Sequence, residues 1–127
     1  MTFGGPRQQA LCSLAALAEL SARDFSIGEG AWPLRGIAVL QHGTVHAYQN
    51  RCPHAGHALN LRPNEFMDPT GTWLSCRSHG ALFDLSSGEC VAGPCAGQAL
   101  RRIPVQVVDG SVHVAPDVDL DAYLARA

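Results

Sequence analysis

Two short segments constrain this chain most strongly, because each places a cysteine and a histidine within one tight turn. Segment 52–57 reads CPHAGH and segment 76–80 reads CRSHG. The glycine in each segment lets the backbone fold tightly and point N–H groups at an anionic sulfur. Both segments follow predicted strands, so we expect two loops, here called the clips, that close on one metal site. The four candidate ligands are Cys52, His54, Cys76 and His79.

The residue types of the two clips leave a structural zinc site open as an alternative. Zinc accepts two thiolates and two imidazoles, as these clips would offer. Zinc fingers, however, usually pair cysteine with cysteine and histidine with histidine at wider spacings. Here each clip mixes the two residue types, and a single residue separates Cys52 from His54. The pairing therefore disfavours a zinc finger.

Short apolar runs between glycines and prolines predict an all-β fold. The predicted strands are 36–40 and 44–48 in a first hairpin, 72–75 and 81–84 around the second clip, and 103–108 and 111–114 in a last hairpin. The last hairpin turns at Asp109–Gly110, a pair that supplies the positive φ angles of a type I′ turn. It is the strongest hairpin signal in the chain.

Little helix is expected outside these strands. Segment 14–20 is a candidate short helix, and segment 119–127 could form a last turn or two. Segment 62–71 holds two prolines, an asparagine and a glycine, so it should be a long loop between the clips.

Size and composition favour one compact domain over residues 1–127. The chain has 127 residues, of which 46% are hydrophobic and 16% charged, and its net charge is −2. No run of basic residues suggests a nucleic-acid or membrane surface. The longest apolar stretch, 10–20, is too short to span a bilayer, and Glu19 within it argues against a secretion signal. Five cysteines without an export signal fit a reducing, cytoplasmic setting.

At the two clips the sequence resembles the Rieske ferredoxins, small soluble members of the Rieske protein family. The resemblance covers about residues 35–114, most of the chain. The matching residues are segments 52–56 and 76–84, Gly88, the pair Gly93–Pro94, Leu100 and the pair Pro104–Val105. One departure is that 21 residues separate His54 from Cys76, a few more than is usual in these ferredoxins. The excess falls in the predicted loop 62–71, where added length has only a small entropic cost.

The resemblance implies one [2Fe–2S] cluster, with Cys52 and Cys76 on one iron and His54 and His79 on the other. It also implies the Rieske fold, in which stacked antiparallel sheets carry a small cluster-binding subdomain of two loops. Gly93–Pro94 matches the proline loop that covers the cluster in this family.

The implied function is the transfer of single electrons from a flavin-containing reductase to a terminal oxygenase-type enzyme. Such a chain is a carrier, not an enzyme, and we expect it to be monomeric. Two alternatives remain: a nitrite reductase small subunit, and a zinc-stabilised interaction module without redox turnover. No phosphate loop, zinc-protease helix or nucleophile elbow is present, and no second domain with a mononuclear iron is expected.

The implied ligand set also predicts the reduction potential. Two thiolates and two neutral imidazoles leave the oxidised core uncharged, whereas four thiolates leave it doubly negative. Potentials accordingly rise from about −400 mV to a range of about −150 to +300 mV. His57 and Ser78 stand where high-potential Rieske proteins have a disulfide, and Ala81 and Phe83 stand where they have hydroxyl donors. We therefore expect a potential near the low end, about −150 mV.

The ligand histidines should also make that potential depend on pH. Ferric iron lowers the pKa of a bound imidazole, so the potential should fall at alkaline pH.

The remaining histidines and cysteines receive simpler interpretations. His57 is expected at the rim of the site, and His42, His46 and His113 are expected to be surface rings. Cys90 and Cys95 bracket the proline loop and could form a disulfide, but buried thiols are expected in a reducing cytoplasm. Cys12 is expected in the core.

Overall fold

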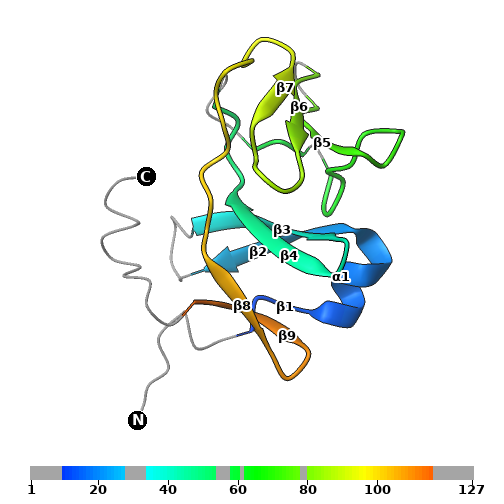
Figure 1. Cartoon of the computed structure of the whole chain (residues 1–127), viewed down its shortest axis with the longest axis vertical. Coiled ribbons are helices and arrows are strands. Elements are labelled where there is room, and N and C mark those ends of the chain that lie inside the picture. Colours follow the sequence, from blue (N-terminus) through cyan, green and yellow to red (C-terminus); the bar gives the residue numbers. More distant parts are fainter. Residues whose placement is uncertain (1–9, 28–33, 54–57, 61, 78–79, 116–127) are drawn as a thin grey trace.

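The computed structural model describes residues 10–27, 34–53, 58–60, 62–77 and 80–115. Within these ranges the chain forms three antiparallel sheets of three strands each and a single short helix. The strand orders are β1-β9-β8, β2-β3-β4 and β5-β6-β7. The elements are β1 (Cys12–Ser13), α1 (Leu14–Leu20), β2 (Ala22–Ile27), β3 (Leu34–Gln41), β4 (Thr44–Gln49), β5 (Trp73–Ser75), β6 (Leu82–Asp84), β7 (Cys90–Ala92), β8 (Val105–Val108) and β9 (Ser111–Val114). Figure 1 shows the β5-β6-β7 sheet at one end of the molecule, the β1-β9-β8 sheet at the other end, and the β2-β3-β4 sheet between them.

The middle sheet, β2-β3-β4, contributes to two separate hydrophobic cores. Ile37 and Val39 on β3 belong to the core that reaches the β5-β6-β7 sheet. Ala38 belongs to the core shared with α1, β8 and β9, and Leu40 packs against that core. Because successive side chains of a strand point to opposite faces, the apolar run of β3 is buried on both sides. The stacked layers predicted from the sequence follow from this run.

The second of these cores is closed by β9 and the helix. Leu17 on α1 and the pair Val112 and Val114 on β9 are at most 1% exposed. Ser13 caps the helix, because its Oγ accepts a hydrogen bond from the Ala16 N–H at 3.1 Å. Gly36 on β3 lies under the ring of Phe25, its partner on β2, where any Cβ would overlap the ring.

The predicted hairpins are confirmed. β3 and β4 turn at His42 and Gly43, with φ of 51° and 78°, and β8 and β9 turn at Asp109 and Gly110, with φ of 51° and 76°. These positive angles are those of the two-residue type I′ connection.

The short helix 14–20, the strands around the second clip and the loop 62–71 are also confirmed. The interpretation of 119–127 lies outside the described residues. The sequence did not predict β1, β2 or β7. Within the described part of the chain, no helix is long and apolar enough to cross a membrane.

Candidate metal centre

Cys52, the first residue of the first clip, lies three residues after β4 and is fully buried. Asn50, 6% exposed, braces the backbone of this clip. Its Oδ1 accepts a hydrogen bond from the Leu59 N–H at 2.8 Å, and its Nδ2 donates to Asn60 Oδ1 at 3.0 Å. One side chain therefore ties the entry of the clip to its exit. His54 and His57 lie outside the described residues.

Cys76, the first residue of the second clip, directly follows β5 and is also fully buried. Its N–H donates to the Ala81 carbonyl at 2.8 Å, and the Gly80 N–H donates to the Cys76 carbonyl at 2.9 Å. Gly80 has φ of 71°, a conformation that L side chains rarely adopt. These bonds make a tight loop that returns the chain directly into β6. Ser78 and His79 lie outside the described residues.

Backbone and side-chain bonds join the two clips. The Arg77 N–H donates to the Leu59 carbonyl at 2.8 Å, so the start of the second clip lies against the segment that directly follows the first. The Arg77 guanidinium donates from Nη2 to the Met67 carbonyl at 2.8 Å, which ties the loop 62–71 to the same place. Cys52 and Cys76 belong to one buried core, together with Ala81, Phe83 and Cys95.

The loop 62–71 is anchored at its other end on β2. The carboxylate of Asp24 accepts hydrogen bonds from the Asn64 N–H at 2.7 Å and from Asn60 Nδ2 at 3.1 Å. The Asp24 N–H donates in turn to Asn64 Oδ1 at 2.9 Å. The segment between the clips is therefore held by the middle sheet.

The residues after β7 form a loop, here called the covering loop (93–98), that packs against the second clip. Gly93 has φ of 101°, and a Cβ placed on it would lie 2.8 Å from the Ala81 Cα atom. Pro94 is exposed, whereas Cys95 is 1% exposed. Burial, followed by the hydrogen bond to Cys90, raises the pKa of the Cys95 thiol to about 12, and the charge of nearby Cys52 adds to this rise. The predicted proline loop thus packs against Ala81, and its Cys95 shares a buried core with both clip cysteines.

The two clip cysteines fit the thiolate half of the predicted ligand set. Both are buried, both are free of disulfides, and they come from two loops that are bonded to each other. Within the described ranges no three metal-ligating side chains gather, since both predicted histidine ligands fall outside them. The full set of Cys52, His54, Cys76 and His79 stays a prediction.

The three histidines within the described residues lie outside the clips. His42 is exposed in the β3–β4 turn, and His46 and His113 are half-buried on β4 and β9. Partial burial, followed by the positive charge of Arg102, lowers the pKa of His46. Cys12 is buried as expected, and Cys90 and Cys95 are free buried thiols.

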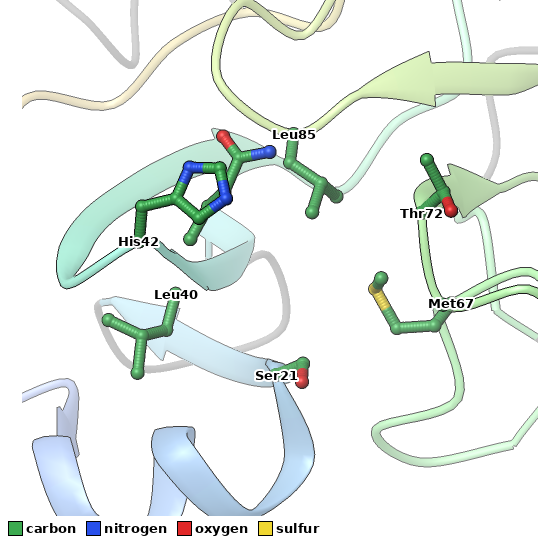
Figure 2. Close-up of a pocket in the computed structure, with 8 residues that line it drawn as sticks. Ser21, Leu40, His42, Met67, Thr72 and Leu85 are labelled. Atoms are coloured by element: carbon green, nitrogen blue, oxygen red, sulfur yellow. The ribbon is translucent and has the colours of Figure 1, made fainter.

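A pocket of about 430 Å³ lies between the β3–β4 turn and the loop that precedes β5. In Figure 2, His42 and Leu40 line one side of this pocket, and Met67 and Thr72 line the other. None of the predicted ligands lines it.

Sequence reasoning missed Asn50 and Arg77, the two residues that brace the clips. Asn50 follows a strand directly, where an amide side chain often bonds to nearby backbone, and this position was the available signal. Arg77 sits inside the ligand motif and gave no signal of its own, because its acceptor on Met67 lies in a loop ten residues away.

Comparison with known proteins gives a family for the chain. A family model described as Rieske [2Fe-2S] domain matches residues 9–116. Oxidoreductase NdmD of Pseudomonas putida is 40% identical over 52 residues, which are 41% of this chain and 8% of that protein, so the chain matches only a small part of that relative.

Two solved structures share the fold. The ferredoxin of carbazole 1,9a-dioxygenase from Nocardioides aromaticivorans IC177 aligns with a TM-score of 0.66 and 23% identity, covering 90% of this chain and 100% of that one. The complex of reduced oxygenase and oxidized ferredoxin in carbazole 1,9a-dioxygenase contains a chain that aligns with a TM-score of 0.65 and 22% identity, covering 87% of this chain and 94% of that one.

Proposed function

Because the chain belongs to the Rieske [2Fe-2S] domain family, we propose that it carries single electrons from a flavin-containing reductase to a terminal oxygenase-type enzyme. The observation that carries the proposal is the pair of free, fully buried cysteines, Cys52 and Cys76, at the starts of two mutually bonded loops. The proposed ligands are these two cysteines with His54 and His79. When bound, the [2Fe–2S] cluster of this family supplies a site that gains and loses one electron.

Burial of the clip cysteines suits this role. Water-excluded thiolates hold iron in a low-dielectric setting, where the charge of the core has a strong effect on the potential. Ala81 and Phe83, which border the second clip, are fully buried and bring no hydroxyl group to the site. A potential near the low end of the Rieske range, about −150 mV, follows from this apolar lining.

An exposed apolar rim supports transient docking of redox partners. Val91 is 47% exposed on β7, and Gly93 and Pro94 are exposed directly after it. The rim adjoins the second clip, because Gly93 packs on the backbone of Ala81. A small apolar patch suits a weak, short-lived complex. The ferredoxin and oxygenase of carbazole 1,9a-dioxygenase, where a protein of this fold is seen with an oxygenase, supply the analogy for the partner.

The ligand proposal is tested by electron paramagnetic resonance after dithionite reduction, paired with iron and sulfide analysis. We expect two irons and two sulfides per chain and a rhombic signal whose mean g lies below that of all-thiolate clusters, because nitrogen donors lower it. Cys52→Ser and Cys76→Ser should lose the signal, whereas Cys12→Ser, a substitution of a buried cysteine in the other core, should keep it. A colourless protein with one zinc per chain would replace this proposal with the interaction module.

Electron transfer is tested separately from cluster binding. The reduced protein is mixed with the oxygenase component of a Rieske dioxygenase, and reoxidation is followed by visible absorbance. We expect transfer to slow when Val91→Lys disrupts the rim, while Val107→Lys, a change at an equally exposed valine on β8, should leave the rate unchanged. Equal rates for the two variants would remove the rim from the docking surface.

A further inference from the structure

Cys90 and Cys95 form a close pair of thiols at the two ends of the turn that contains Gly93 and Pro94. The Cys95 thiol donates a hydrogen bond to Cys90 Sγ, and the two sulfur atoms are 2.8 Å apart. Both cysteines are free in the structure. A disulfide joins sulfur atoms about 2.05 Å apart, so the two sulfurs must approach each other by less than about 1 Å.

The two thiols differ in access and in hydrogen bonding. Cys90 is 7% exposed, whereas Cys95 is 1% exposed. Cys90 Sγ is the acceptor of the bond from Cys95, and its own S–H faces the Ala92 carbonyl at 3.2 Å. Cys90 is the more exposed thiol, so an oxidant reaches it first, and Cys95, whose sulfur lies 2.8 Å away, is placed to react with it.

We propose that Cys90 and Cys95 are a dithiol site that small-molecule disulfides oxidise to an intramolecular disulfide across the Gly93–Pro94 turn. This chemistry does not depend on the proposed electron transfer. The site differs from the predicted cluster ligands, and no part of it lies outside the described residues.

The reaction is a thiol–disulfide exchange in two steps. The Cys90 sulfur attacks one sulfur of the oxidant, the S–S bond of the oxidant breaks, and the released thiolate takes up the proton from Cys90. The Cys95 sulfur then attacks Cys90 Sγ, which breaks the mixed disulfide and releases a second thiol that carries the Cys95 proton. The protein loses two electrons and two protons, and the oxidant becomes two thiols. The closeness of the two sulfurs makes the second step fast, because it is intramolecular.

The new bond would stiffen the covering loop. In the reduced structure this loop holds together through the Ala96 N–H bonded to the Gly93 carbonyl at 3.3 Å and the Gln98 N–H bonded to the Cys95 carbonyl at 2.9 Å. The Cys90 N–H closes the loop by donating to the Gln98 carbonyl at 2.8 Å. A covalent link between Cys90 and Cys95 closes a ring that contains Gly93, and it restrains the turn that packs on Ala81. Oxidation would therefore fix the surface beside the second clip.

The chain offers a clean test by mass spectrometry. Its basic residues are all arginines, and trypsin releases segment 78–101, which contains Cys90 and Cys95 and no other cysteine. The intact protein with its metal centre is incubated with oxidised glutathione, quenched with N-ethylmaleimide and digested. We expect peptide 78–101 to lose the mass of two hydrogen atoms and to take up no maleimide, and we expect dithiothreitol to reverse both changes.

Two controls make the result specific. Cys12, which is 8% exposed, matches Cys90 in burial but has no thiol neighbour among the described residues, so its peptide should stay fully alkylated. In Cys95→Ser the reaction should stop at a glutathione adduct on Cys90.

Amide hydrogen exchange gives a second readout on the same samples. Ala96 and Gln98 should exchange at least several-fold more slowly after oxidation of the native protein, and at an unchanged rate in Cys95→Ser. The proposal is overturned if peptide 78–101 of the native protein stays fully alkylated after incubation with oxidised glutathione. A lasting glutathione adduct on Cys90 of the native protein would overturn it equally, because Cys95 would then not have reacted.

Discussion

The close packing of Gly93 on the second clip allows the sharpest prediction. In Gly93→Ala, a Cβ would lie 2.8 Å from the Ala81 Cα atom and 3.2 Å from its Cβ atom, at a residue with φ of 101°. The positive φ costs about 1–3 kcal/mol for a residue with a side chain. The overlap adds about 1–3 kcal/mol, because a backbone atom cannot rotate away as the tip of a side chain can.

Gly97→Ala is the matched control for this change. Gly97 lies in the same loop with φ of 92°, but a Cβ there would meet no atom within 4 Å. Both variants reduce the entropy of the unfolded chain equally, so this effect cancels in the comparison. The difference between them isolates the contact, and we expect Gly93→Ala to be less stable by about 1–3 kcal/mol.

The assay is thermal unfolding of both variants, followed by circular dichroism and by the visible absorbance of the metal centre. One kcal/mol corresponds to a shift in Tm of roughly 2–8 °C for domains from about 60 to 250 residues. Gly93→Ala should also lose its colour faster than Gly97→Ala, since a lifted covering loop admits solvent to the clips. Equal Tm values for the two variants would refute the reasoning, because the contact with Ala81 would then contribute nothing.

Three further predictions concern a buried hydroxyl, a buried carboxylate and a predicted histidine ligand. Tyr48→Phe should lower the free energy of unfolding in urea by about 1–3 kcal/mol, because the buried Leu85 carbonyl loses the hydroxyl that donates to it at 2.8 Å; an unchanged urea midpoint would contradict this. Four hydrogen bonds lower the pKa of Asp68 from 3.8 to about 2, and the bond from the Thr70 hydroxyl has the largest effect. The stability it gives is therefore present above pH 3.8 and lost as the pH falls toward 2, so Tm should drop over this window more steeply in the native protein than in Asp68→Asn. His79→Cys should lower the midpoint potential measured by voltammetry toward the all-thiolate value of about −400 mV, while His42→Cys, in an exposed turn, should not.

Where the sequence predicted structure correctly, the determining chemistry was local. The type I′ turn at Asp109 and Gly110 needs two adjacent residues that accept positive φ. Aspartate followed by glycine is such a pair, and it can be read from the sequence alone. The run from Ile37 to Leu40 on β3 is apolar on both faces, which only a strand between two layers requires. The clip cysteines could also be predicted from the sequence, because each clip holds its cysteine, histidine and glycine within one short segment.

The missed elements depend on partners far along the chain. Strand β2 begins ARD, and the charges of Arg23 and Asp24 break the apolar alternation that would announce a strand. Asp24 is tolerated there because Asn60 and Asn64, which lie 36 and 40 residues away, satisfy its carboxylate. Strand β7 has three residues and pairs with β6 across an irregular register, so no periodicity could develop in it. The hydrogen bond between Asn50 and Leu59 could not be predicted either, because it depends on how the chain folds back between them.

The site end of the molecule is held to the middle sheet by a few specific contacts. Tyr48 on β4 is fully buried and reaches the Leu85 carbonyl, while the Gly88 backbone lies against its ring so closely that a Cβ would be 2.7 Å away. The Arg102 guanidinium carbon lies over this ring at 5.4 Å from its centroid, and the guanidinium donates to the Ser86 carbonyl. These contacts fix the turn after β6, and β6 is the strand that the second clip leads into. Sites built on braced strands are held more precisely than sites on loops, and the proposed electron transfer would benefit because less reorganisation would accompany each transfer.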